Sequence, residues 1–185
     1  TSKRIVTANE ISGFKGVAVS AVNQDDVAAW SAGVGVAGEG AGIQFSTTVN
    51  VISIDTLAYI DENAKVNQAA GASSDQSVLV TAGNDYSFKG FSGGVSASGE
   101  GAAVTPAVFV GVIRPTTKAF IGKSASVSAK ADIIIGAYAS EELLSMAASI
   151  AGAGEGAGVA GSVLVIDIDS VTHAYIGESA VVKAG

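Results

Sequence analysis

The 185-residue chain contains no cysteine, which excludes disulfides, zinc sites built on thiolates and cysteine nucleophiles. It has only 2 prolines, and its 24 glycines follow no G-X-Y period, so a collagen-like triple helix is excluded as well. Leucine and methionine together number 6, against 39 valines and isoleucines, and β-branched residues favour pleated sheet over helix. The composition therefore predicts an all-β protein.

Charge and long apolar runs are also scarce. The 10 basic residues do not cluster and are outnumbered by 17 acidic ones, which argues against a nucleic-acid partner. The longest apolar runs, such as residues 107–113, are too short to cross a bilayer as a helix. Apolar residues make up 48% of the chain, which argues against disorder. We therefore expect a folded protein with no nucleic-acid partner and no membrane span.

The main positive feature of the sequence is an internal repeat. A Gly-Glu-Gly tripeptide occurs at 38–40, 99–101 and 154–156, and an Ala-aromatic-Ile tripeptide occurs at 58–60, 119–121 and 174–176. The spacing between the two tripeptides is the same in every copy. The sequence therefore predicts one continuous segment, 1–185, whose internal copies span about 9–68, 69–129 and 130–185.

The copies differ in length, because the interval from position 38 to position 99 is longer than the interval from 99 to 154. The difference lies between positions 67 and 76, a stretch of small and polar side chains that is typical of a surface loop.

Within each copy, apolar residues alternate over short runs, as at Val34/Val36 and Ile166/Ile168, which indicates β-strands. One copy divides into three turns of about 18 to 20 residues, the size of one coil of a parallel β-solenoid. The prediction is a parallel β-helix of about nine coils that pair roughly 4.8 Å apart, giving a rod about 40 Å long. A left-handed β-helix is the second reading, because residues 121–127 and 176–182 look like its hexapeptide.

Two local expectations accompany this fold. Residues 25–30 and 140–144 begin with polar and acidic side chains and predict short helices that interrupt the coils. No polar cap is evident at either end of the repeat, and an open solenoid end exposes unpaired backbone groups. We therefore expect end-to-end contacts with adjoining repeats or with other subunits.

Glutamate recurs between glycines in every copy, as Glu39, Glu100 and Glu155. The glycines suit a corner with positive φ, and glutamate is a side chain that such a corner shows to water. The alternative is a weak Ca²⁺ site, although no second acidic residue recurs beside the glutamates. No other metal ligands are predicted.

An aromatic residue also recurs, as Tyr59, Phe120 and Tyr175. Each ring stands between Ala and Ile, so it points outward if the isoleucine points inward. With three coils between successive rings, they would form a sparse row that contacts sugars, a neighbouring filament or a domain. The alternative is that each ring covers its own corner.

Residues for catalysis are not evident. His173 is the only histidine, and its equivalents in the other copies are Leu57 and Lys118, which indicates a surface position. The acidic pair Asp61/Glu62 is replaced in the other copies, as turn residues are. We therefore predict no catalytic residue, no cofactor and no enzymatic activity.

The motif Ala-Tyr-Ile-Gly-x-x-Ala-x-Val-x-Ala at 174–184, with Gly-Glu-Gly-Ala-Gly upstream at 154–158, resembles the repeats of large bacterial exoproteins. The class is the leukotoxin-like filamentous adhesins, which are similar in kind to filamentous haemagglutinin. The resemblance implies a secreted, right-handed parallel β-helix displayed at the cell surface, and it implies no catalytic residues.

Three functional hypotheses follow. The first is a structural segment of an extracellular fibre or adhesin, a rigid rod for surface display, adhesion or filament formation, with host or cell-surface glycans or proteins as further partners. The second is a secreted β-helical domain that binds carbohydrate or cleaves polysaccharide. The third is a self-assembling subunit of a surface filament.

Overall fold

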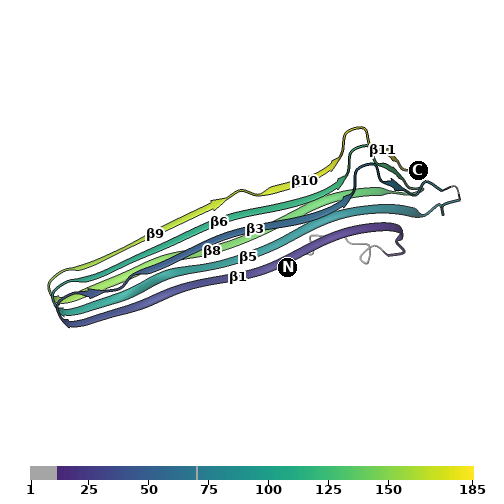
Figure 1. The fold of residues 1–185 in the computed structure, drawn as a ribbon. Coiled ribbons are helices and arrows are strands. Elements are labelled where there is room, and N and C mark those ends of the chain that lie inside the picture. The colour runs from purple at the N-terminus through teal and green to yellow at the C-terminus, as the bar shows by residue number, and fades with distance from the viewer. Residues whose placement is uncertain (1–11, 70) are drawn as a thin grey trace.

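The computed structural model describes residues 12–69 and 71–185, which form β-strands and connecting turns without any helix. The strands in chain order are β1 (Lys15–Glu39), β2 (Gly42–Ile43), β3 (Ser46–Ile60), β4 (Lys65–Val66), β5 (Gln76–Glu100), β6 (Ala103–Ile121), β7 (Ser126–Ser128), β8 (Ile133–Glu155), β9 (Gly158–Ile168), β10 (Val171–Ile176) and β11 (Val181–Lys183). The longest strands run side by side along the molecule, which is narrow and elongated (Figure 1).

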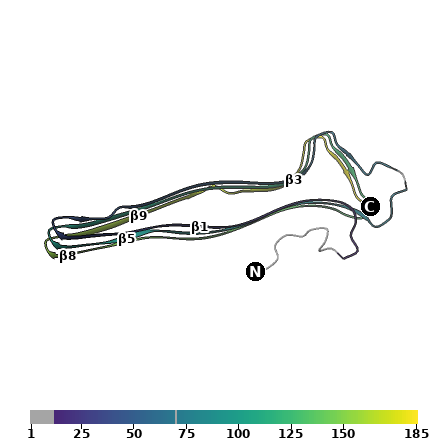
Figure 2. The ribbon, with the colours of Figure 1, turned by 60° about the horizontal axis from the view of Figure 1, so that its bottom comes forward.

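The strand pairs are parallel and fall into three sheets. Sheet A has the order β1-β5-β8, and sheet C has the order β4-β7-β11. Sheet B is centred on β6, with β2 and β3 on one side and β9 and β10 on the other. Figure 2 shows the strands of sheets A and B as two separate bundles that run along the molecule. The prediction of an all-β protein with parallel sheets is confirmed.

Each strand pairs with its own equivalent in the next copy of the repeat. Val17 of β1 lies beside Val78 of β5, which lies beside Ile133 of β8, so the pairing distances along the chain are those of the whole repeat. Each copy of the repeat therefore forms one layer of the molecule. We name these layers layer 1 (residues 15–66), layer 2 (76–128) and layer 3 (133–183).

The prediction of three short coils in each copy is therefore wrong, because one copy makes a single layer. The physical reason is that alternation between inward and outward side chains continues almost without a break over the 25 residues of β1. Between Gly16 and Gly40 no described residue has positive φ, so no corner interrupts the strand. The molecule is consequently long along its strands, about 80 Å, and only about 10 Å deep across its three layers.

Glycine forms the tight turn that joins sheet A to sheet B. In each copy the glycine after the recurrent glutamate has positive φ: 84° at Gly40, 108° at Gly101 and 138° at Gly156. The predicted corner is thus confirmed, and we call this end of the molecule the turn end. The opposite end, where sheet C lies, is the corner end.

The connections at the corner end explain the unequal copies. The chain passes from β4 to β5 through residues 67–75 but from β7 to β8 through residues 129–132 only. Asp75 in the longer connection accepts hydrogen bonds from Lys15 of β1 and from Ser73, and these bonds lower the pKa of its carboxyl group to about 2.

The two predicted helices are absent. Residues 25–30 lie within β1 and residues 140–144 within β8, and both segments pair in register with β5. A single helical turn is marginal by itself, whereas each strand residue here gains ladder hydrogen bonds and places alternate side chains in the core.

The core lies mainly in layer 2, between the facing sheets. One buried cluster, near the corner end, includes Val78, Val80, Ile121 and Val127, and a second cluster comprises Tyr86, Phe88, Phe109 and Ile113. Layer 1 adds the buried Ala58 and Ile60 to the first cluster, whereas Val17 in layer 1 and Ile133 in layer 3 pack against it but are only partly buried.

Tight packing at Gly90 provides a test of this core. A Cβ atom there would lie 2.4 Å from the Phe109 ring and 2.9 Å from the Phe88 ring, whereas one at Gly152 would meet nothing within 4 Å. We expect Gly90→Ala to lower the free energy of unfolding by about 1–3 kcal/mol. Gly152→Ala should change it by less than about 0.5 kcal/mol. Urea denaturation followed by circular dichroism measures both, and equal losses would contradict the packing described.

Candidate contact surfaces

The three recurrent aromatic side chains form a continuous stack on the outer face of sheet B. Tyr59 pairs with Phe120, and Phe120 with Tyr175, in the strand register. The ring centroids are 5.0 and 4.9 Å apart, and the ring planes are inclined by only 6° and 3°. The prediction of a sparse row with three coils between rings is therefore wrong, because adjacent layers bring the rings into direct contact.

This stack, which we call the aromatic ladder, leaves few ring faces free. Both faces of Phe120 are covered by tyrosine rings, and Tyr59 and Tyr175 remain 45% and 43% exposed. A sugar stacks on the face of an aromatic ring, so the middle of the ladder offers it no platform. The two outer ring faces point along the direction in which the layers stack.

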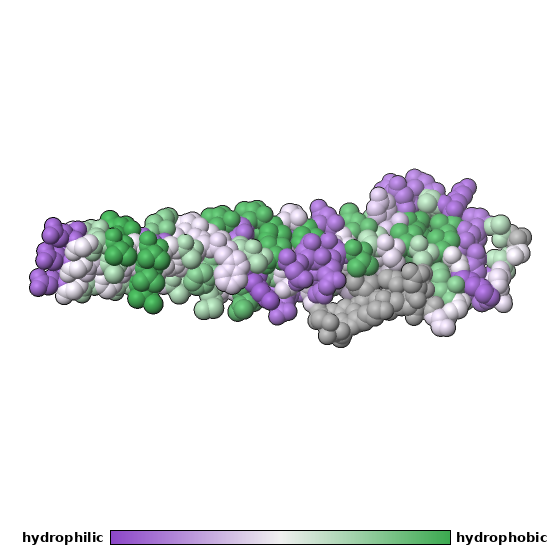
Figure 3. Space-filling model, turned by 90° about the horizontal axis from the view of Figure 1, so that it is seen from below, coloured by the Kyte–Doolittle hydropathy of each residue, from purple (hydrophilic) through white to green (hydrophobic). Residues whose placement is uncertain are grey.

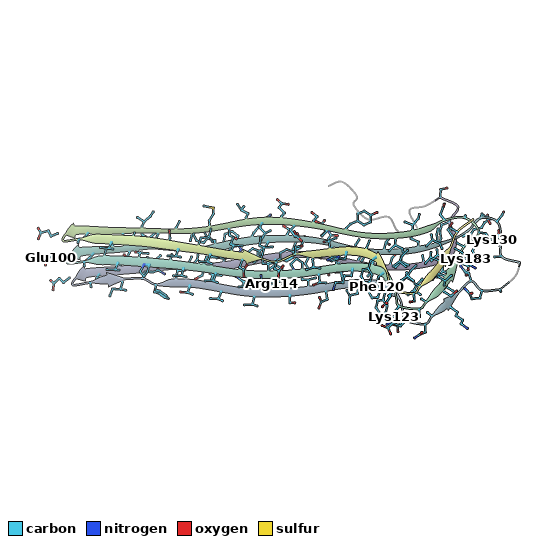
Figure 4. All side chains as sticks on the ribbon, turned by 90° about the horizontal axis from the view of Figure 1, so that it is seen from above. Glu100, Arg114, Phe120, Lys123, Lys130 and Lys183 are labelled. Atoms are coloured by element: carbon cyan, nitrogen blue, oxygen red, sulfur yellow. The ribbon has the colours of Figure 1, made fainter. Side chains whose placement is uncertain are left out.

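The recurrent glutamates form a column at the turn end. Glu39, Glu100 and Glu155 are register partners, and Figure 4 shows Glu100 at the extremity of the molecule. In the part of the chain that the structure describes, no group of three or more His, Asp or Glu side chains is placed to hold a metal ion. The Ca²⁺ hypothesis therefore gains no support from the geometry.

The remaining residues considered from the sequence lie apart from one another. His173 is exposed and pairs with Lys118, which pairs with Leu57, so the equivalence inferred from the repeat is confirmed. The acidic pair Asp61/Glu62 lies in the corner after β3. None of these positions lies near the glutamate column at the turn end.

The outer face of sheet B is apolar near the turn end, a feature that sequence reasoning missed. Columns of β-branched residues cross its strands, and Val49 and Val165, at the two ends of one column, are 61% and 49% exposed. Figure 3 views the molecule from the side of β1 and shows hydrophobic residues along much of that side as well. The signal was the uninterrupted apolar run at 107–113, because a strand with no alternation is apolar on both faces.

The outer face of sheet A carries an apolar groove of about 500 Å³. Its small residues Ala32, Gly93 and Ala148 are register partners, so the groove runs across the strands. Phe91 lines one side of it, and Val34 and Ile150 line the other.

Two acidic side chains also lie on the inner face of sheet A. Asp25 of β1 and Glu141 of β8 form a column with Tyr86 of β5, which lies between them. Tyr86 is fully buried, and its hydroxyl has no hydrogen-bond partner among the described residues. Burial, followed by the negative charge of Asp25, raises the pKa of Tyr86 to about 12. Asn23 donates a hydrogen bond of 2.7 Å to the Asp25 carboxylate, and the Ser170 hydroxyl donates one of 2.6 Å to Glu141.

Comparison of the chain with protein-family models, with curated proteins and with solved structures found no match. No helix that could span a membrane occurs in residues 12–69 or 71–185.

The ladder predicts a graded loss of stability. Phe120→Leu removes two ring contacts and Tyr59→Leu removes one, and each aromatic pair contributes about 0.5–1.5 kcal/mol beyond its buried area. We expect Phe120→Leu to lower the free energy of unfolding about twice as much as Tyr59→Leu. Lys118→Leu, on the same strand face, is the control without a ring contact. A larger loss for Tyr59 than for Phe120 in urea titrations would contradict a ladder.

Tyr86 predicts a loss of stability at high pH. Its folded pKa of about 12 lies above the ordinary value of 10.0, so its contribution is complete below pH 10.0 and is lost as the pH rises towards 12. Tyr86→Phe should abolish this part of the alkaline loss, and it should also stabilise the protein by about 1 kcal/mol because it removes an unpaired buried hydroxyl. The control is Tyr138→Phe, which alters a tyrosine that is 38% exposed. Parallel alkaline unfolding curves for wild type and Tyr86→Phe would refute the prediction.

Proposed function

We propose that this chain is a section of a β-solenoid rod with a structural role, in which each copy of the repeat forms one layer and the layers stack along the rod. The observation that carries the proposal is the pairing of the strands with their equivalents in the next copy, in all three sheets. Such pairing adds length by adding copies, since each layer presents to the next the same pattern of backbone groups and inward side chains.

Layers 1 and 3 support the proposal because each has one sheet edge that pairs with no strand among the described residues. Within the described residues, β1 and β8 each pair on one side only, which leaves strands of 25 and 23 residues with open edges. Long open edges are sites of further strand pairing unless charges, prolines or bulges block them. One more layer on either side would bury the partly exposed Val17 and Ile133 as completely as Val78 is buried now.

An extracellular fibre or adhesin is the setting that we favour for this rod. The motifs that resemble filamentous adhesins form the structural elements of each layer: Gly-Glu-Gly makes the turn between sheets, and the Ala-aromatic-Ile motif supplies the aromatic ladder. In this proposal the chain provides reach and rigidity at a cell surface, and other parts of a fibre supply specific recognition.

A carbohydrate-binding role is less well supported, because the rings of the aromatic ladder cover one another. In a self-assembling subunit the next layer belongs to another molecule, and in a longer chain it belongs to the same one. In both cases the next layer pairs with the open edges described above.

Assembly of the purified chain tests the proposal. At high concentration we expect rods or ribbons about 80 Å wide, with a reflection near roughly 4.8 Å along the rod axis in fibre diffraction. Val27→Lys places a charge on the inner face of the open edge of layer 1 and should shorten the rods. Val22→Lys makes the same change on the outer face, where the side chain is 58% exposed, and should leave the rods long. Discrete particles at all concentrations and pH values would contradict a stacking role.

A further inference from the structure

If the chain forms a rod as proposed above, its open edges need a partner, and the pH decides how readily that partner binds. We propose that layer 3 of one copy of this chain stacks head-to-tail on layer 1 of a second copy in a single register, and that acidification promotes this junction because it brings Asp25 and Glu141 together inside the rod.

The side-chain columns define the register of the junction. The existing columns continue if each residue of layer 3 meets the residue of layer 1 that is equivalent to it in the repeat. The inner matches are Ile133 with Val17, Ile135 with Val19, Leu143 with Val27, Ala174 with Ala58 and Ile176 with Ile60. On the outer face, Tyr175 meets Tyr59 and extends the aromatic ladder. A slip by one residue would turn inner side chains outward, so alternative registers are disfavoured.

The contact is large enough for a stable complex. Strands of 25 residues span about 80 Å, and facing sheets lie about 10 Å apart, so the end of a layer covers about 800 Å². This is the area per partner of a standard protein–protein interface. Backbone hydrogen bonds along both sheets add to it, which is why a second copy is the occupant that fits this edge.

One pair of residues that the junction brings together, Glu141 and Asp25, is unfavourable at neutral pH because both side chains are carboxylates. Within a chain, Tyr86 separates Asp25 from Glu141 in their column. Across the junction, Glu141 of one copy becomes the direct neighbour of Asp25 of the next, about one strand spacing of roughly 4.8 Å away. Two carboxylates enclosed at that distance do not both ionise readily, so the junction takes up a proton.

The groups around the pair do not neutralise it. From β5, the neutral Tyr86 faces both carboxylates, and Asn23 and Ser170 donate hydrogen bonds to them. From β3, the inner residues of this region are Ile54 and Thr56, which are uncharged. A hollow beside this column is lined by four carboxylates and one ammonium group, namely Asp26, Asp85, Glu141, Glu142 and Lys89. All of these groups except Glu141 lie on the outer face, where water screens them, so the single ammonium group of Lys89 does not neutralise the pair.

The chain contains its own control column. Asp26, Ser87 and Glu142 are register partners one residue further along, on the outer face of the same strands. The junction brings Glu142 and Asp26 equally close, but in water, where charges at this distance interact weakly. The variants D25N/E141Q and D26N/E142Q remove the same number of charges and differ only in the face from which they remove them.

The experiment measures the critical concentration for rod formation by sedimentation, with electron microscopy to identify rods, from about pH 8 to about pH 5.5. For wild type we expect this concentration to fall about tenfold or more on acidification, because the junction binds a proton. D25N/E141Q should form rods at both pH values with critical concentrations within about twofold of each other, since no carboxylate pair remains. D26N/E142Q should keep the pH dependence of wild type, which separates the effect from a general loss of net charge.

In D25N/E141Q the amide oxygens can still accept the hydrogen bonds from Asn23 and Ser170. Circular dichroism establishes that both double variants fold. The single variant D25N, with the same expected loss of pH dependence, replaces the double variant if the latter does not fold. Equal assembly of wild type at both pH values, or unchanged pH dependence in D25N/E141Q, overturns the acid-pair inference and leaves the proposed rod intact. Failure of all variants to form rods at any pH removes the proposed function and this inference together.

Discussion

In-register parallel pairing of whole repeat copies is the constraint on which the rest of the structure depends. Because strands in a sheet lie about 4.8 Å apart, this register places every paired residue directly beside its equivalents. Each paired position of the repeat therefore forms a column of three neighbouring side chains, one from each copy. The aromatic ladder, the columns of β-branched residues on sheet B and the column of glutamates at the turn end are all consequences of this one geometric rule.

The same rule restricts where charge is tolerated. At the turn end, Glu39, Glu100 and Glu155 are adjacent like charges, but they extend into water, which screens them. In the interior, Asp25 and Glu141 occur in one column only with the neutral Tyr86 between them. Within this column the interior thus avoids direct neighbours of like charge, and that separation is interrupted only where one copy would meet another.

The shape of each layer follows from small side chains and few corners. The facing sheets carry many small side chains on their inner faces, and an aromatic cluster that includes Phe88 and Phe109 packs between them. Glycine with positive φ permits the sharp turn at one end, and Ser124 and Ser179 adopt positive φ in equivalent corners at the other. Between these ends nothing interrupts the long strands of sheet A, so the layer becomes a long, flat loop. Its outer faces are apolar towards the turn end, and sheet A also carries a charged region around Asp26 and Glu142.

The sequence by itself determined the repeat, its loop insertion, the all-β parallel character and the equivalence of positions such as His173 and Lys118, because these depend on composition and spacing along the chain. Only the tertiary structure decided that one copy makes one layer. The period of the repeat fits three short circuits or one long one equally well, and the choice depends on whether a strand continues through positions 25–30. Local acidity there suggested a helix, but pairing with β5 stabilises the extended chain. The structure therefore turned a predicted sparse row of rings into a ladder and brought Asp25, Tyr86 and Glu141 into one interior column.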